Sequence, residues 1–99
     1  MKLSKAHTVK LKELCNIYNV DKMYLFGSAV TDNFDDESDV DFLVKFKPID
    51  LSKYFENYIN FKESLKNLLK RDVDLLEEQS IKNPILKKSI DKSKALIYG

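Results

Sequence analysis

Hydrophobic and polar residues follow two different periods along the chain, and these predict helices and strands in turn. A helical period begins after Ser4, a residue type that favours helix N-caps, and continues to Asn19. Its apolar positions are Val9, Leu11, Leu14, Cys15 and Tyr18. The apolar run at 23–26 ends in Gly-Ser at 27–28, which predicts a short buried strand and a tight turn. Residues 29–37 are polar and turn-rich, and predict a helical turn followed by a loop.

Alternation with period two is clearest from Ser38 to Phe46 and predicts a second strand. One face of it carries Val40, Phe42, Val44 and Phe46, and the other carries Asp39, Asp41, Leu43 and Lys45. Pro48 ends this strand, and the helical period returns over 51–70. The apolar side of this long helix is expected to comprise Leu51, Tyr54, Phe55, Tyr58, Ile59, Phe61, Leu65, Leu68 and Leu69.

The last third of the chain predicts one more strand and one more helix. The strand is expected at 73–76, and Asn83 followed by Pro84 is typical of a helix start. The final helix is expected to run on until it frays at Gly99, and to bury Ile85, Leu86, Ile90 and either Leu96 or Ile97. The order helix, strand, strand, helix, strand, helix predicts an α/β (α+β) fold in which helices cover a small mixed sheet.

Length and composition narrow the class of protein. The chain has 99 residues, of which 43% are hydrophobic and 33% charged, and this predicts a single water-soluble domain over 1–99. No apolar run has the roughly 18 to 20 residues of a membrane span, and the amino terminus lacks the layout of a signal peptide. We therefore expect a cytoplasmic protein that does not enter membranes. The single cysteine, Cys15, excludes an intramolecular disulfide.

The distribution of charge says more than the net value of +1. Acidic residues gather between Asp32 and Asp41. Lysines gather towards the end of the chain, at Lys82, Lys87, Lys88, Lys92 and Lys94. These lysines are expected to form a solvated helix face, so we do not expect the protein to bind nucleic acid.

The carboxylates at the start of the second strand need a chemical reason, because Asp is depleted from strands. Asp39 and Asp41 point to the same side, about 6.6 Å apart. Asp74 would join them if its strand lies beside theirs. Three such carboxylates repel one another, and protonation or cations must relieve that repulsion. Among cations, oxygen ligands without His or Cys favour Mg²⁺. Two such ions suit nucleotidyl or phosphoryl transfer.

The Gly-Ser pair supplies a second part of such a site. Gly27 has no side chain to keep a phosphate away, and Ser28 offers a hydroxyl beside exposed backbone N–H groups. Other readings remain open: Asp39 and Asp41 could be solvated, and Asp74 could pair with Lys70 or Arg71. A calcium loop over 32–41 lacks the central Gly and the final Glu at the proper offset.

These residues together resemble the minimal nucleotidyltransferases of the DNA polymerase β superfamily. The matching segments are "FGS", ten residues, "DVDFLV" and, a helix later, "RDVDLL". The resemblance implies a nucleotidyltransferase fold in which Asp39, Asp41 and Asp74 are catalytic and bind Mg²⁺. It also implies that Gly27 and Ser28 bind a nucleoside triphosphate such as ATP.

The resemblance further implies a partner, an all-helical HEPN protein whose tyrosine receives AMP, with the transferase as antitoxin. Many members of the family carry Arg directly after Gly-Ser, whereas this chain has Ala29, so a nearby lysine would have to replace that triphosphate contact. Two alternatives remain. The domain could be a binding module that neutralises or scaffolds a helical partner without chemistry, or a regulator that contacts nucleic acid through the last helix.

Overall fold

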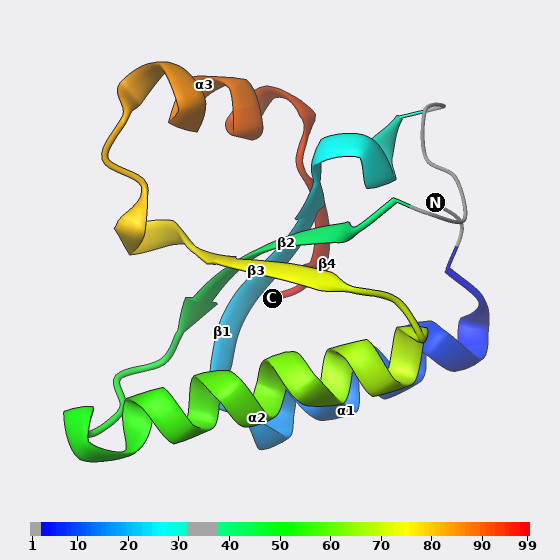
Figure 1. The fold of residues 1–99 in the computed structure, drawn as a ribbon, viewed down its shortest axis with the longest axis vertical. Coiled ribbons are helices and arrows are strands. Elements are labelled where there is room, and N and C mark those ends of the chain that lie inside the picture. The colour runs from blue at the N-terminus through cyan, green and yellow to red at the C-terminus, as the bar shows by residue number, and fades with distance from the viewer. Residues whose placement is uncertain (1–2, 32–37) are drawn as a thin grey trace.

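The computed structural model describes residues 3–31 and 38–99, and places helices on both faces of a four-stranded sheet (Figure 1). In chain order the elements are α1 (Lys5–Ile17), β1 (Val20–Phe26), the 3-10 helix η1 (Gly27–Val30), β2 (Val40–Phe46), α2 (Leu51–Leu69), β3 (Val73–Glu77), the 3-10 helix η2 (Glu78–Ser80), α3 (Pro84–Ser93) and β4 (Ala95–Tyr98). The predicted mixed α/β architecture is confirmed. The loop predicted up to residue 37 lies, from residue 32 on, outside the described residues.

The sheet has the strand order β3-β2-β1-β4. β1 is antiparallel to both of its neighbours, β2 and β4. β2 and β3 are parallel, and α2 makes the crossover between them. The beginning of β2, the beginning of β3 and the end of β1 therefore meet at one end of the sheet.

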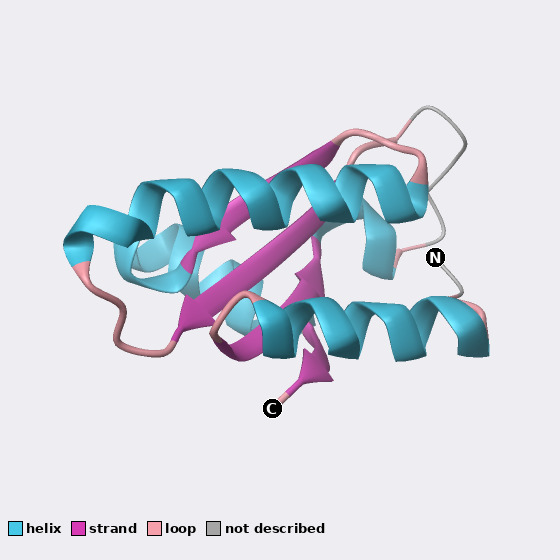
Figure 2. Cartoon of the chain, turned by 90° about the horizontal axis from the view of Figure 1, so that it is seen from below, coloured by secondary structure: helices cyan, strands magenta, loops and turns pink. Residues whose placement is uncertain are grey.

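Two helices cover one face of the sheet. α1 and α2 lie side by side against it, as Figure 2 shows, and their inward side chains meet those of the strands. The buried core on this face includes Leu11, Cys15, Val20, Met23, Leu25, Val40, Phe42, Val44, Phe46, Phe61, Leu65, Leu69, Val73 and Leu75. The alternation predicted for 40–46 is thus confirmed, because its even-numbered residues face α1 and α2.

The other face of the sheet is covered only in part, by α3 and its connections (Figure 1). Leu43 and Ile90 are buried, with 1% and 4% of their surfaces exposed, but they do not belong to the main core cluster. Since neighbouring residues of a strand point to opposite faces, Asp41 lies on the same face as Leu43. This second face is therefore where Asp41 lies, together with Asp74, which is opposite it on β3.

Side chains cap two helices as the sequence predicts. Ser4 Oγ accepts a hydrogen bond from the backbone N–H of His7 at 3.1 Å, at the start of α1. Asn83 Oδ1 accepts from the N–H groups of Ile85 and Leu86 at 2.9 and 3.3 Å, at the start of α3. Both contacts satisfy backbone donors that have no partner within the helix.

Replacing the cap of α3 should lower stability by a measurable amount. We expect Asn83→Ala to reduce the free energy of unfolding by about 1 kcal/mol, because two N–H groups lose their acceptor. Urea unfolding followed by circular dichroism measures the change. Asn60→Ala, at an exposed position inside α2, is the matched control and should be neutral or slightly stabilising. Equal curves for Asn83→Ala and the wild type would contradict the capping role.

The prediction of a final helix that continues to Gly99 is wrong. α3 ends at Ser93, and residues 95–98 form β4 on the outer edge of β1. Pairing with β1 satisfies backbone groups that would otherwise remain unpaired at the edge of the sheet. Leu96 and Ile97 therefore belong to a strand, and Ile85 and Leu86 of α3 are 80% and 47% exposed rather than buried.

The apolar side predicted for the long helix is also partly wrong. α2 buries Phe61, Leu65 and Leu69, which recur every four residues in its second half. Leu51, Phe55 and Ile59 lie on another side of the helix and are exposed by 85%, 71% and 46%. They are exposed because only one side of a helix can face the sheet, and in α2 that side carries Phe61, Leu65 and Leu69. No helix in the described part of the chain is long and apolar enough to cross a membrane.

Candidate active site

The acidic residues of two strands meet at the end of the sheet near η1. In the parallel pairing of β2 and β3, Asp41 lies directly opposite Asp74, and on its other side Asp41 lies opposite Phe26 of β1. Residues opposite each other on neighbouring strands are about 4.8 Å apart and point to the same face. The predicted adjacency of Asp41 and Asp74 is therefore confirmed, since their strands are neighbours in register.

Asp39 lies two residues before Asp41, in the extended segment that leads into β2, and is exposed. The pKa of the Asp41 carboxyl is raised, first because burial removes water and then because the negative charges of Asp74 and Asp39 are near. The charges of Asp74 and Asp39 thus both act on the Asp41 carboxyl. Their combined negative charge would attract cations to this end of the sheet.

Gly27 is required here for two reasons. Its φ angle of +69° lies in the left-handed region, which L side chains rarely adopt. A Cβ atom at this position would also lie 2.3 Å from Asp41 Oδ2. The missing side chain therefore makes room for the Asp41 carboxylate, a reason that the sequence did not reveal.

The turn after Gly27 is held by its own backbone. The carbonyl oxygen of Ser28 accepts hydrogen bonds from Thr31, from the backbone N–H at 3.0 Å and from Oγ1 at 2.9 Å. Ala29, the next residue, is 1% exposed and packs into the core. The position after Gly-Ser therefore points inward, so a charged group for a bound phosphate has to come from another element.

Two tyrosines of α2 hold β3 in place beside β2. The hydroxyl of Tyr58 donates to the backbone carbonyl of Leu75, and the hydroxyl of Tyr54 donates to the carboxylate of Glu77. Burial is the main cause that raises the pKa of both phenols, so both remain protonated donors at neutral pH. These bonds fix the strand on which Asp74 lies.

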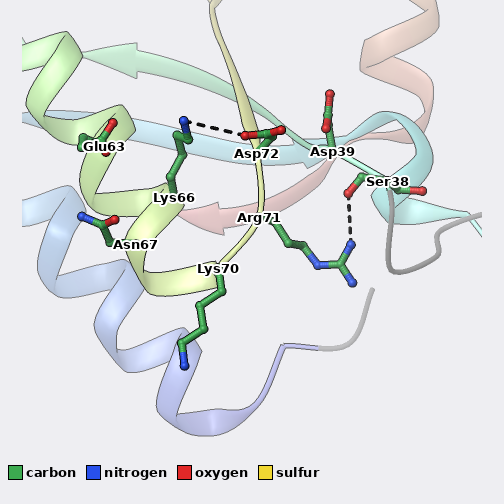
Figure 3. A pocket seen from close by; sticks show the side chains of 8 residues that line it. All are labelled: Ser38, Asp39, Glu63, Lys66, Asn67, Lys70, Arg71 and Asp72. Atoms are coloured by element: carbon green, nitrogen blue, oxygen red, sulfur yellow. Dashed lines mark hydrogen bonds and ion pairs between the residues drawn. The ribbon is translucent and has the colours of Figure 1, made fainter.

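A solvent-open cavity of about 440 Å³ lies beside Asp39, at the end of α2 (Figure 3). It is lined by Ser38, Asp39, Glu63, Lys66, Asn67, Lys70, Arg71 and Asp72. Arg71 Nη1 donates to the Ser38 carbonyl at 3.0 Å, and Lys66 Nζ lies 3.7 Å from Asp72 Oδ1. Asp41 and Asp74 are not among its lining residues, so of the three carboxylates Asp39 alone lines this polar cavity.

The three carboxylates are the oxygen ligands that Mg²⁺ prefers. Within residues 3–31 and 38–99, no group of three or more His, Cys, Asp or Glu side chains is arranged as a metal site. The chemistry of the donors fits a magnesium ion, because the raised pKa of Asp41 reflects repulsion and desolvation that a cation would relieve. The carboxylates would have to turn towards the ion on binding.

Lys94 is a residue of this face that the sequence grouped with solvated lysines. Only 21% of its side chain is exposed. Its Nζ lies 2.8 Å from Asp91 Oδ1 and 4.3 Å from the centroid of the Tyr24 ring. The hydrogen bond to Asp91 is the main cause that raises the pKa of Lys94. No sequence signal pointed to it, because its place depends on the pairing of β4 with β1.

Comparison with known proteins gives a consistent result. The family model described as polymerase β nucleotidyltransferase matches residues 9–99. A candidate protein adenylyltransferase of Methanocaldococcus jannaschii is 39% identical over 89 residues, which cover 88% of this chain and 84% of that protein. The protein adenylyltransferase MntA of Thermococcus cleftensis is 38% identical over 81 residues, which cover 81% of this chain and 78% of that protein.

Solved structures share the fold. A candidate minimal nucleotidyltransferase superimposes with a TM-score of 0.76 at 23% identity, over 92% of this chain and 89% of that chain. A toxin-antitoxin structure with AMP-PNP has a TM-score of 0.68 at 26% identity, and the match covers 98% of this chain and 74% of that chain. The mixed sheet and its helices are thus those of nucleotidyltransferase structures.

Proposed function

The chain belongs to the polymerase β nucleotidyltransferase family, and we propose that it transfers AMP from ATP to a protein hydroxyl. The acceptor we propose is a tyrosine of a HEPN-family helical toxin, which makes this chain an antitoxin. The observation that carries the proposal is the register that sets Asp41 opposite Asp74, with Gly27 making room for the Asp41 carboxylate. Relatives named protein adenylyltransferases and a toxin-antitoxin neighbour with AMP-PNP support the choice of nucleotide and partner.

We assign separate roles to the Gly-Ser turn and to the three carboxylates. Ser28 and the N–H groups around it would hold the β and γ phosphates. Asp39 and Asp41 would hold two magnesium ions, with Asp74 sharing one of them. When bound, these ions would stabilise negative charge on the attacking and leaving oxygens.

Asp74 would also orient the acceptor hydroxyl and accept its proton. The hydroxyl oxygen then forms a bond to the α-phosphorus of ATP, while the bond from that phosphorus to the pyrophosphate oxygen breaks. The products are the AMP ester of the acceptor and pyrophosphate. Because Asp74 lies on an edge strand, with β2 as its single neighbour in the sheet, an acceptor from another protein could approach from the open side.

The proposed reaction can be tested directly. We expect ATP labelled at the α-phosphate, with Mg²⁺, to label a HEPN protein that co-purifies with this chain. Mass spectrometry should find a gain of whole AMP units on a tyrosine, and replacing that tyrosine by Phe should abolish labelling. Labelling that persists at the same level without Mg²⁺, or in the Phe variant, would contradict the proposal.

Binding of the nucleotide should also raise the thermal midpoint of unfolding. ATP at ten times its Kd, with Mg²⁺, stabilises the folded state by about 1.4 kcal/mol if it binds only that state. For a chain of this size the midpoint would rise by roughly 6 to 11 °C, measured by differential scanning fluorimetry.

One observation favours the alternative of a binding module without chemistry, namely the exposed side chains of Leu51, Phe55 and Ile59 on α2. An exposed apolar surface of this kind suits contact with a helical partner. The same melting experiment separates the two functions. An unchanged midpoint at millimolar ATP and Mg²⁺ would favour the binding module.

A further inference from the structure

A nucleotide at the Gly27–Ser28 turn brings several negative charges to an end of the sheet that is already acidic. The residues of the turn itself supply no cation, since Ala29 is buried and Val30 is apolar. A side chain that pairs with the phosphates, in addition to the magnesium ions, would therefore have to reach the turn from elsewhere in the fold.

Lys94 is placed to do this by the pairing of β4 with β1. Leu96 lies opposite Tyr24 and Ala95 opposite Leu25, so the next step of the register sets Lys94 beside Phe26. Phe26 is itself opposite Asp41. Two strand spacings, roughly 10 Å, thus separate the backbone of Lys94 from that of Asp41. Lys94 stands on the side of the turn away from the acids.

The ammonium group also lies on the correct face of the sheet. It sits over the ring of Tyr24, which is two residues before Phe26 and so points to the same face as Phe26 and Asp41. Figure 1 shows that α3 ends beside β1 and η1, and contacts between α3 and η1 agree. The side chain is held by Asp91 and Tyr24 rather than extended into water.

We propose that Lys94 binds the terminal phosphates of the nucleotide at the Gly27–Ser28 turn, and that Asp91 and Tyr24 hold its side chain ready for this contact. This inference rests on the proposed function, because it assumes that the turn receives a nucleoside triphosphate. The phosphates would lie between a cation on the β4 side and the carboxylates of β2 and β3. Lys94 would thus supply the positive charge that the buried position of Ala29 cannot supply.

The test compares ATP with AMP in a variant that keeps the shape of the side chain. Lys94→Met preserves an unbranched chain over Tyr24 but removes the charge. We expect its affinity for ATP with Mg²⁺, measured by titration calorimetry, to fall about 10- to 100-fold. Its affinity for AMP, which has no terminal phosphates, should stay within about twofold of the wild type. Lys94→Arg should retain most of the affinity for ATP.

Lys92→Met is the matched control, since Lys92 is an exposed lysine in the last turn of the same helix, and it should bind ATP like the wild type. Two results would overturn the assignment of Lys94: unchanged ATP affinity in Lys94→Met, or equal losses for ATP and AMP, which would indicate a structural role. Failure of the wild type to bind ATP would instead overturn the proposed function and this inference with it.

Discussion

Asp41→Asn should abolish nucleotidyl transfer while making the protein more stable. Asn cannot carry the negative charge that holds a magnesium ion, and we expect the rate of transfer to fall roughly a thousandfold or more. The same substitution removes a partly buried charge that faces the charges of Asp74 and Asp39. After solvent screening this is worth about 0.5 to 1 kcal/mol, or a midpoint higher by roughly 2 to 8 °C at neutral pH.

The gain in stability should depend on pH in a defined direction. The pKa of Asp41 is raised in the folded protein, so the folded protein binds this proton more tightly than the unfolded chain does. The free energy of unfolding therefore falls as the pH rises and Asp41 becomes ionised in the folded protein. The midpoint of the wild type should therefore fall relative to that of Asp41→Asn as the pH rises from below 3.8, the usual Asp value, through the raised pKa. Thermal melts over this range measure the difference.

The effect of Mg²⁺ provides the control for this prediction. The ion should raise the midpoint of the wild type more than that of Asp41→Asn, because the repulsion it relieves is present in the wild type alone. Asp21→Asn, a carboxylate at the opposite end of β1 from Phe26, should not alter the response to Mg²⁺. Full transfer activity in Asp41→Asn would refute a metal-binding role for Asp41.

Gly27→Ala should lose both stability and activity. The left-handed φ angle alone costs a non-glycine residue roughly 1 to 2 kcal/mol. The new methyl group would also lie only 2.3 Å from Asp41 Oδ2 and would push the carboxylate out of position. We expect unfolding to become easier by at least about 2 kcal/mol, and transfer to fall on the order of a hundredfold.

A double-mutant cycle separates the two causes. In an Asp41→Ala background the oxygen that clashes is absent, so Gly27→Ala should cost less stability there than in the wild type. Chemical denaturation of the four proteins gives the coupling energy. Gly99→Ala, at the other glycine with a positive φ angle, tests a left-handed position away from the acids and should leave transfer unchanged. Additive costs at positions 27 and 41 would mean that the carboxylate does not use the space at Gly27.

The sequence predicted those parts of the fold and site whose signals are local. Alternation around Val40 and Phe42 identified β2 and its buried face, and Ser4 and Asn83 marked helix starts through their own side-chain bonds. The adjacency of Asp41 and Asp74 followed from treating two strands as neighbours. Each of these inferences needs only short-range periodicity or one rule of strand packing.

Features that depend on tertiary pairing could not be predicted in the same way. Leu96 and Ile97 follow a helix and are apolar, and a short apolar run does not distinguish a helix from a strand. The edge of β1 that β4 covers is remote in sequence, so Lys94 could be placed only after that pairing was known. The sequence suggested that Gly27 lets a phosphate come close. Its closeness to the Asp41 carboxylate, which belongs to the neighbouring strand, leaves no signal in the local sequence.

The proposed site draws on all four strands, because Lys94 leads into β4, Phe26 ends β1, and Asp41 and Asp74 belong to β2 and β3. A molecule in which β4 or β3 has detached from the sheet would therefore no longer hold these four residues together. Hydrogen exchange of the amides that pair β4 with β1 and β3 with β2 measures how often such opening occurs. Catalytic competence would then require that both edge strands are paired with the rest of the sheet.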